Sequence, residues 1–322
     1  MNIEMIHAAA TRIGTHARRT PLLSASLLDR IAGRRVLVKA ECLQWTGSFK
    51  FRGGWSAVSA LPPEVRARGV LAYSSGNHAQ GVALAAALHG VPAVIIMPSD
   101  APRVKIANTK AYGAEVVLYD RATEDREAIG AALADKRGLS LIKPYDDAQV
   151  IAGQGTVGLE IAEQAIALGI SNATMITCCG GGGLTAGIAL ALAAHAPAML
   201  VRTAEPAGFD DVARSLASGQ VQSNAALTGS ICDAIVTPQP GALTFPILQR
   251  HCGPGLVVSD DEALRAMALA FAHLRIVVEP GGAVALAAAL FRQDLPDTVI
   301  CTASGGNVDP VLFADTLRRF PV

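Results

Sequence analysis

One lysine, Lys50, stands among small residues in the segment ECLQWTGSFKFRGG at positions 41–54. Glycine and serine precede it and two glycines follow it, and glycine, which has no Cβ, lets another group approach the backbone closely. A lysine amine can hold an aldehyde covalently, or remove a proton when burial lowers its pKa. An isolated lysine is more often a solvated surface residue, so the function of Lys50 depends on what the chain places beside it.

Four consecutive glycines, Gly180, Gly181, Gly182 and Gly183, separate an apolar run from an Ala/Leu-rich run. Glycines allow backbone N–H groups to turn toward an anion, and the start of a helix adds the positive end of its dipole. A tight turn, which is the alternative, needs only one or two glycines. The segment therefore predicts a phosphate-binding loop.

The same loop also fits a dinucleotide-binding pattern. Gly181, Gly183 and Ala186 have the G-x-G-x-x-A spacing, and Glu205 ends the next apolar run, where a ribose-binding acid would lie. This alternative predicts a dinucleotide-binding oxidoreductase. Against it, the motif follows a complete α/β unit in the middle of the chain, and Lys50 is left without a function. Pyridoxal phosphate, with one phosphate and one aldehyde, accounts for both segments.

Two further polar turns could contribute to a site. The segment SSGNHAQG at 74–81 contains hydroxyl and amide groups at an expected strand-to-helix turn, where helix N–H groups can bind a carboxylate. Capping of the helix by Ser75 or Asn77 explains the same residues equally well. In TASGGNVD at 302–309, Ser304 could lie beside a flat ligand or simply begin a turn.

Other kinds of catalytic site lack their residues. No H-x-x-x-H pair, zinc-type Cys/His spacing or G-x-S-x-G nucleophile turn occurs in the sequence. Glu205, Asp210 and Asp211 could bind a divalent cation with a loop carbonyl, although a solvated acidic loop is the commoner case.

Composition limits the partners. The 27 basic and 27 acidic residues cancel, which argues against nucleic acid and an anionic membrane surface as partners. The six cysteines have no C-x-x-C spacing, and the N-terminus has no apolar signal core, so we expect reduced, mostly buried thiols and a cytoplasmic location. The most apolar stretch, 184–201, contains His195 and Pro197 and is expected to be a core helix followed by a strand rather than a membrane span.

Short apolar runs alternate with Ala-rich helical runs, which is typical of an α/β fold with parallel sheets. The segment 123–138 has Thr123 as its expected helix N-cap, and 206–258 is expected to form loops and short helices. We predict strands at 69–75, 92–98, 114–120, 173–179, 198–205 and 298–304, and helices at 77–90, 102–113, 123–138, 154–169, 184–195, 260–274 and 282–292.

With these motifs in this order, the chain resembles the pyridoxal-phosphate serine/threonine dehydratases and the related serine racemases, which have the tryptophan-synthase-β-like fold (fold type II). The similarity runs through nearly the whole chain and is weakest at about 207–258. Its motifs are TGSFKFRG, SSGNHAQG, VIAGQGT (150–156), GGGGLTAG, AEP (204–206), VEPGGA (278–283) and SGGNVD (304–309).

The resemblance implies two open, mostly parallel α/β domains with the cofactor in the cleft between them. The small domain would comprise 69–147, inserted into a large domain of 1–68 and 148–322. A homodimer or higher homo-oligomer is also implied, as is a small amino acid substrate.

The resemblance also implies residue roles. Lys50 would be the Schiff-base lysine and Phe49 would pack beside the cofactor. Asn77 would bind the pyridine 3′ oxygen, and Ser304 would face the ring nitrogen. The cofactor phosphate would be bound by backbone N–H groups of Gly180, Gly181, Gly182, Gly183 and Leu184. The substrate carboxylate would be bound by the turn of Ser74, Ser75, Gly76, Asn77 and His78.

The activity implied is dehydration and deamination of a β-hydroxy amino acid to a 2-oxo acid and ammonia, with L-threonine and L-serine as the expected substrates. Racemisation is the alternative reaction, with Ser75 as the catalytic residue opposite Lys50. The alternative substrates are other 3-hydroxy amino acids, such as 3-hydroxyaspartate, phenylserine or hydroxyectoine-derived compounds. A non-catalytic cofactor carrier is also open. A site for Mg²⁺, Mn²⁺ or Ca²⁺ is implied at Glu205, Asp211 and the carbonyl of Phe209.

Overall fold

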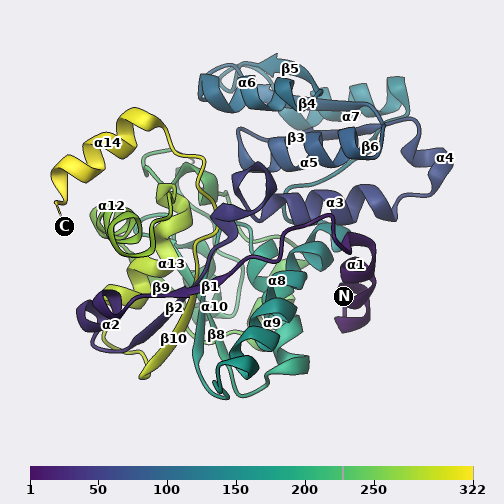
Figure 1. The fold of residues 1–322 in the computed structure, drawn as a ribbon. Helices are drawn as coiled ribbons and strands as arrows, with labels where there is room; N and C mark the ends of the chain where they lie inside the picture. The colour runs from purple at the N-terminus through teal and green to yellow at the C-terminus, as the bar shows by residue number, and fades with distance from the viewer. Residues whose placement is uncertain (227, 322) are drawn as a thin grey trace.

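The computed structural model, which describes residues 1–226 and 228–321, contains two β-sheets, each covered by helices (Figure 1). The strands are β1 (Leu22–Ser24), β2 (Arg35–Lys39), β3 (Val70–Tyr73), β4 (Ala93–Pro98), β5 (Glu115–Tyr119), β6 (Ser140–Leu141), β7 (Thr174–Cys178), β8 (Leu200–Pro206), β9 (Leu256–Val258) and β10 (Thr298–Thr302).

The longer α-helices pack around these sheets, and short 3-10 or π-helical turns join them. The α-helices are α1 (Ile3–Ile13), α2 (Ser26–Ala32), α3 (Lys50–Ala60), α4 (Pro63–Arg66), α5 (Asn77–Leu88), α6 (Arg103–Ala111), α7 (Arg126–Arg137), α8 (Ala148–Ala167), α9 (Gly183–His195), α10 (Asp211–Ser218), α11 (Thr244–His251), α12 (Asp260–Leu269), α13 (Pro280–Phe291) and α14 (Pro310–Arg319). The short turns are η1 (Glu41–Leu43), η2 (Trp45–Gly47), η3 (Asp233–Ile235) and the π-helical η4 (Ala270–Leu274).

The larger sheet has the order β1-β2-β10-β7-β8-β9 and the smaller sheet has the order β5-β4-β3-β6. All pairs are parallel except β1 with β2. Parallel strands need crossover connections that cover both faces, so their side chains are apolar and buried, as in β4 and β7. The predicted α/β fold class is confirmed.

The smaller sheet lies within 69–147, the segment predicted as the small domain (Figure 1). Helix α3 precedes that segment, yet its Phe51 and Trp55 share one apolar core with Val70, Ala72 and Val82 of the smaller lobe. The domain boundaries themselves stay a prediction.

Three helices meet at the centre of the molecule by direct backbone contact. A Cβ on Gly153 of α8 would lie 2.4 Å from the carbonyl oxygen of Arg52 in α3, and a Cβ on Gly187 of α9 would lie 2.5 Å from the nitrogen of Gly155 in α8. Only glycine fits such approaches. This packing fixes the N-terminal end of α3, where Lys50 lies, relative to the N-terminal end of α9, where the four glycines lie.

Several predicted boundaries were wrong for identifiable reasons. Helix α7 begins at Arg126, and its N-cap is Asp125, whose carboxylate accepts the N–H groups of Glu127 and Ala128, rather than Thr123. Helix α8 begins six residues earlier than expected, because Asp147 caps it in the same way. The segment 206–258 contains the expected short helices and also β9, which extends the larger sheet.

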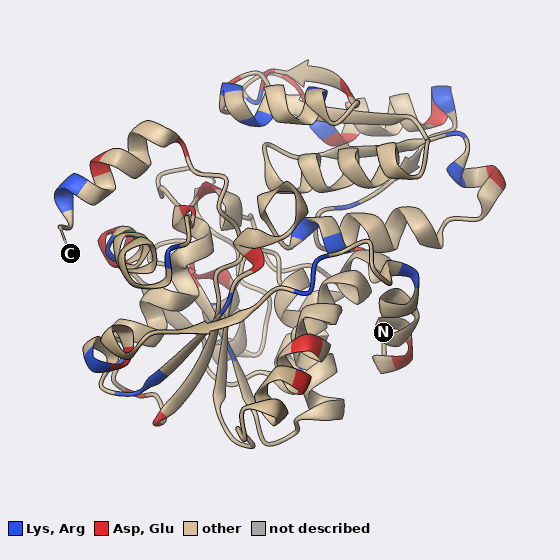
Figure 2. Ribbon diagram, in the orientation of Figure 1, with Lys and Arg blue, Asp and Glu red and all other residues tan. Residues whose placement is uncertain are grey.

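Charged residues of both signs are distributed over both lobes (Figure 2), consistent with the cancelling charges of the sequence. The apolar stretch 184–201 forms most of α9 and the start of β8, as predicted. Five of the six cysteines are buried and Cys252 is half-buried, and all six are free thiols. No helix within the described residues is long and apolar enough to cross a membrane.

Candidate active site

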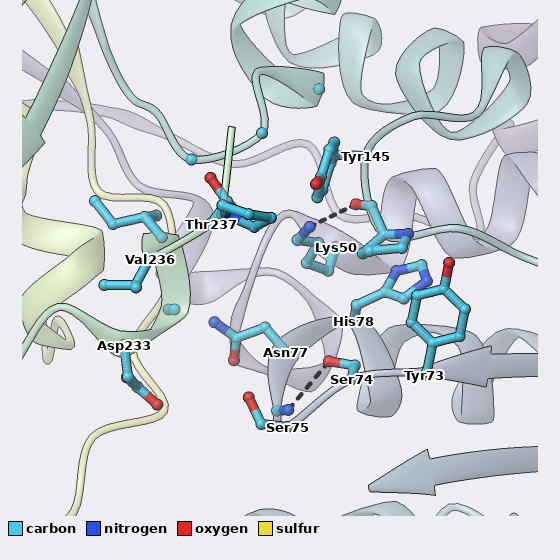
Figure 3. Close-up of a pocket in the computed structure, with 18 of the residues that line it drawn as sticks. Lys50, Tyr73, Ser74, Ser75, Asn77, His78, Tyr145, Asp233, Val236 and Thr237 are labelled. Carbon is cyan, nitrogen blue, oxygen red and sulfur yellow. Dashed lines mark hydrogen bonds between the residues drawn. The ribbon is translucent and has the colours of Figure 1, made fainter. Parts of the chain in front are cut away.

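A cavity of about 680 Å³ lies between the two lobes, within the range that small-molecule sites occupy. It is lined by side chains from the smaller lobe on one side and by the glycine loop on the other (Figure 3). The residues that line it include Phe49, Lys50, Tyr73, Ser74, Ser75, Gly76, Asn77, His78, Lys105, Arg126, Tyr145, Gln154, Gly180, Gly181, Gly182, Gly183, Leu184, Asp233, Val236, Thr237 and Ser304.

Lys50 is the first residue of α3, and its amine points into this cavity. Its Nζ donates a hydrogen bond of 2.7 Å to the carbonyl oxygen of Pro144 and lies 5.2 Å from the centre of the Phe49 ring (Figure 3). Burial disfavours the charged ammonium and lowers the pKa of Lys50 to about 8. About a tenth of this amine is therefore unprotonated at pH 7, far more than for an ordinary lysine, and a nucleophile or base requires this form.

The glycine loop has the geometry of an anion cradle. A Cβ on Gly180 would lie 2.8 Å from the carbonyl oxygen of Ile235, one on Gly181 would lie 2.2 Å from the Tyr145 ring, and Gly182 has φ +90°. Helix α9 begins at Gly183, so its free N–H groups face the loop. A phosphate fits this donor set, because the loop supplies N–H groups where side chains would block access.

The turn from Ser74 to His78, at the start of α5, lines the same cavity as Lys50 (Figure 3). The Ser74 hydroxyl accepts the Gly76 N–H at 3.1 Å, which holds the turn, while Ser75 lies half-buried on the cavity wall. Of the two alternatives for this turn, helix capping is not observed, because the cap residue is Gly76 and neither Ser75 nor Asn77 caps the helix with its side chain.

His78 is buried and electrically neutral. Its Nε2 lies 2.9 Å from the carbonyl oxygen of Ile142, so Nε2 carries the proton and Nδ1 is left as an acceptor, without a hydrogen-bond partner among the described residues. Burial, reinforced by the nearby Lys50 charge, lowers the pKa of His78 to about 3. The imidazole therefore does not compete with Lys50 for a proton at physiological pH.

The Asn77 side chain is held by residues of the larger lobe. Its amide nitrogen donates to Glu279 at 2.5 Å, and its amide oxygen accepts from Asn307 at 2.7 Å. Burial raises the pKa of Glu279, against the opposing charge of Lys105. Ser304 is buried at the end of β10, in the cavity wall, and its carbonyl accepts the Phe49 N–H at 3.1 Å. The structure thus brings Phe49, Asn77 and Ser304 into one site with Lys50.

The residues expected to bind a metal lie outside this cavity. The Glu205 carboxylate is fully buried and accepts the N–H groups of Val212 and Ala213 at 2.9 and 2.7 Å, so it caps α10 and is not presented to a ribose. Burial raises the pKa of Glu205, and it raises that of Asp211 to about 6. Within the described chain, Asp211 Oδ2 has no hydrogen-bond partner and no group of three or more His, Cys, Asp or Glu side chains has metal-binding geometry.

Sequence reasoning missed several residues of the cavity. Lys105 is buried, with its Nζ 3.3 Å from Asp233 Oδ2 and 3.9 Å from Glu279 Oε2, and it lies against Gly76. Tyr145 packs on Gly181, and Arg126 lies over the Tyr73 ring at 5.1 Å. None of these residues lies in a glycine-rich motif. Only the position of Tyr145 in the segment just before VIAGQGT could have drawn attention to it.

Comparison with known proteins agrees with the fold and the site. A family model described as pyridoxal-phosphate dependent enzyme matches residues 13–305. An L-threo-3-hydroxyaspartate ammonia-lyase from Pseudomonas sp is 43% identical over 96% of each chain. The crystal structure of threonine deaminase from T.th. superposes with a TM-score of 0.91 at 45% identity, covering 96% of this chain and 99% of that one. Maize serine racemase superposes with a TM-score of 0.92 at 36% identity, covering 99% and 97%.

The fold, the buried lysine and the glycine cradle define a cofactor-dependent enzyme that binds a small anionic group. The chain belongs to the pyridoxal-phosphate dependent enzyme family. Among its relatives are ammonia-lyases and serine racemases, which confirms the resemblance inferred from the motifs. These relatives do not decide between elimination and racemisation for this chain.

Proposed function

We propose that this protein is a pyridoxal-phosphate dependent ammonia-lyase, which converts a 3-hydroxy amino acid into a 2-oxo acid and ammonia. The observation that carries the proposal is the buried amine of Lys50, with its pKa lowered to about 8, in the same cavity as the glycine cradle. Lys50 would hold the cofactor aldehyde, and the N–H groups of residues 180–184 would hold its phosphate. When bound, this cofactor withdraws electrons from the substrate α-carbon.

The residues of the chain then have separable tasks. Once the substrate amine has replaced it on the cofactor, the freed Lys50 amine would take the α-proton, and the Pro144 carbonyl at 2.7 Å would orient that amine. The turn 74–78 and the N-terminus of α5 bind the substrate carboxylate. Ser304 would face the pyridine nitrogen. A hydroxyl can hydrogen-bond a neutral ring nitrogen but does not keep it protonated as a carboxylate would, which favours elimination of the hydroxyl group over a long-lived carbanion.

Within the hydroxy amino acids, the cavity favours a substrate with a second carboxylate over the L-threonine or L-serine first expected. Lys105 is buried against the substrate turn, where the exposed Asp233 at 3.3 Å and the buried Glu279 at 3.9 Å share its charge, and Arg126 lines the same cavity. The lining also carries Arg121, Glu124 and Asp125, so charges of both signs surround this part of the cavity. Two of the similar proteins are L-threo-3-hydroxyaspartate ammonia-lyases, at 43% and 41% identity.

Release of 2-oxo acid from a panel of L-threonine, L-serine and L-threo-3-hydroxyaspartate tests both proposals. We expect Arg126→Met to raise KM for the dicarboxylate ~10-fold or more and to leave KM for threonine nearly unchanged. An equal change for both substrates would contradict the charge argument. No 2-oxo acid from any substrate, with the cofactor bound, would instead favour a non-catalytic carrier. Tight NAD binding without pyridoxal phosphate would favour the oxidoreductase alternative.

Racemisation is a second candidate, favoured by Ser75, which lies half-buried on the wall of the same cavity as Lys50 (Figure 3). By its resemblance to the serine racemases, the Ser75 hydroxyl would return a proton to the α-carbon from the face opposite the lysine. Chiral analysis of the remaining serine tests this function. We expect Ser75→Ala to abolish D-serine formation while elimination persists, and any D-serine formed by that variant would refute the assignment.

The divalent cation site at Glu205, Asp211 and the Phe209 carbonyl also stays a proposal. Its support is the pair of buried carboxylates, both with raised pKa values, which a bound cation would stabilise in their charged forms. The cytoplasmic location and the homo-oligomeric assembly likewise stay proposals, based on composition and on the resemblance.

A further inference from the structure

Gln154 is a buried glutamine in the cavity wall whose side chain finds no hydrogen-bond partner among the described residues. It lies on α8, is 0% exposed and lines the cavity. Within residues 1–226 and 228–321, neither its Oε1 nor its Nε2 contacts a donor or acceptor in hydrogen-bonding geometry. A primary amide offers two donors and two lone pairs, and leaving them unpaired in the interior is costly. Such a group is expected in a site whose ligand completes the hydrogen bonds.

The position of the amide identifies the part of the ligand that it would meet. Its oxygen end lies 2.9 Å from the place that a Cβ on Gly183 would occupy, and its nitrogen end lies 2.9 Å from the corresponding place on Gly53. Gly183 is the first residue of α9 and the last of the four glycines, and Gly53 lies one turn beyond Lys50 in α3. The amide therefore spans the gap between the lysine helix and the glycine loop.

The glycine loop lacks a charged partner of its own. The segment CCGGGGLTAG at 178–187 contains no lysine, arginine or histidine, so the loop itself offers an anion only backbone N–H groups and the helix dipole. The oxygen and nitrogen of a side-chain amide exchange places by rotation about its last torsion angle. After that rotation, the Gln154 NH₂ group lies at the Gly183 end, where it can donate to an anionic oxygen.

We propose that Gln154 is an additional cofactor-binding residue, whose side-chain amide donates a hydrogen bond to the phosphate held by residues 180–183. The inference depends on the proposed pyridoxal-phosphate function and adds to it a side-chain donor from α8. It also gives a role to the VIAGQGT segment, for which the motif analysis found none.

The test compares two ligands that differ only in the phosphate. Apo-protein is titrated with pyridoxal phosphate and with pyridoxal, and the dissociation constants are read from the absorbance and fluorescence of the bound ligand. We expect Gln154→Leu to weaken binding of pyridoxal phosphate about 10- to 100-fold, as expected for loss of one hydrogen bond to a charged oxygen, and to leave pyridoxal binding unchanged. Inorganic phosphate should also compete less well in this variant.

Gln80→Leu is the matched control, because Gln80 is also a buried glutamine with an unpaired Nε2 in the described chain but does not line this cavity. Its affinity for both ligands should match that of the wild type. In addition, Gln154→Leu should raise the Tm of the apo-protein, since an unpaired buried amide is replaced by an apolar group, and should lower the Tm rise caused by pyridoxal phosphate.

Two results would overturn the inference. One is an unchanged affinity of Gln154→Leu for pyridoxal phosphate, and the other is an equal loss for both ligands, which would assign Gln154 to the ring or to the packing of α3. Failure of the wild-type protein to bind pyridoxal phosphate would reject the proposed function instead, so the two failures are distinguishable.

Discussion

Replacement of Arg52 by methionine tests whether the buried ion cluster around this arginine stabilises the packing of α3 against α8. Arg52 lies in the first turn of α3, is 1% exposed, and donates to both oxygens of Glu41 at 2.8 Å. It also donates to both oxygens of Glu160 on α8, at 2.7 and 3.1 Å. Lys39 completes the cluster through a contact of 2.5 Å with Glu160, so two cations balance two carboxylates.

The magnitude follows from the charge left behind. Methionine fills much of the volume of arginine but leaves the fully buried Glu41 with only the Thr20 hydroxyl, at 2.5 Å, among the side-chain donors that the described chain provides. Removing one partner of a buried ion pair costs ~3–5 kcal/mol, because the remaining charge is desolvated and uncompensated. That is a large fraction of the ~5–15 kcal/mol by which a typical domain is stable.

Urea unfolding followed by circular dichroism measures this loss in the free energy of unfolding. The matched control is Arg19→Met, which breaks the Arg19–Glu163 pair of 2.7 Å between side chains that are 55% and 63% exposed. This control should cost less than ~1 kcal/mol. The double variant Arg52→Met with Glu41→Gln should recover much of the loss, since no unpaired charge remains. A loss below ~1 kcal/mol for Arg52→Met alone would refute the reasoning.

Three further predictions concern the site and its surroundings. Burial lowers the pKa of Lys50 to about 8, so between pH 8 and 10.5 the unfolded apo-protein binds a proton that the folded state lacks, and stability rises with pH in that window. Lys50→Met should remove this slope and should be up to ~3 kcal/mol more stable than the wild type at pH 7. An unchanged pH profile of unfolding in this variant would contradict the prediction. Gly181→Ala should weaken pyridoxal-phosphate binding at least ~10-fold, because its methyl group overlaps the Tyr145 ring. The control Gly130→Ala, whose methyl group has its nearest neighbours at 3.5 Å, should bind the cofactor normally and gain ~0.5–1 kcal/mol of stability. Burial raises the pKa of Asp211 from 3.8 to about 6, so the folded state binds the extra proton between these values, and stability should fall as pH rises from about 4 to 6. Above pH 6, Mg²⁺, Mn²⁺ or Ca²⁺ should restore the lost stability. Asp211→Asn should show neither effect, and a cation response of that variant in thermal unfolding would place the site elsewhere.

Local chemistry explains which elements could be predicted from the sequence. The alternation of apolar and Ala-rich runs predicted the parallel strands, because burial on both faces leaves no polar positions in strands such as β4. Glycine-rich turns predicted the anion cradle for a similar reason, since only glycine permits that backbone. Caps were less certain, as the competition between Thr123 and Asp125 for the start of α7 shows.

The amino-acid sequence by itself determined the fold class, and it singled out Lys50 and the glycine loop as candidate site residues, since these depend on residue type over short stretches. Only the tertiary structure brought Lys105 and Gln154, from two different helices, to one cavity, and paired Asn77 with Glu279. It also decided that Glu205 caps α10 and that burial brings the pKa of Lys50 down to about 8. Burial and long-range pairing are properties of the packed chain, so no local pattern could have specified them.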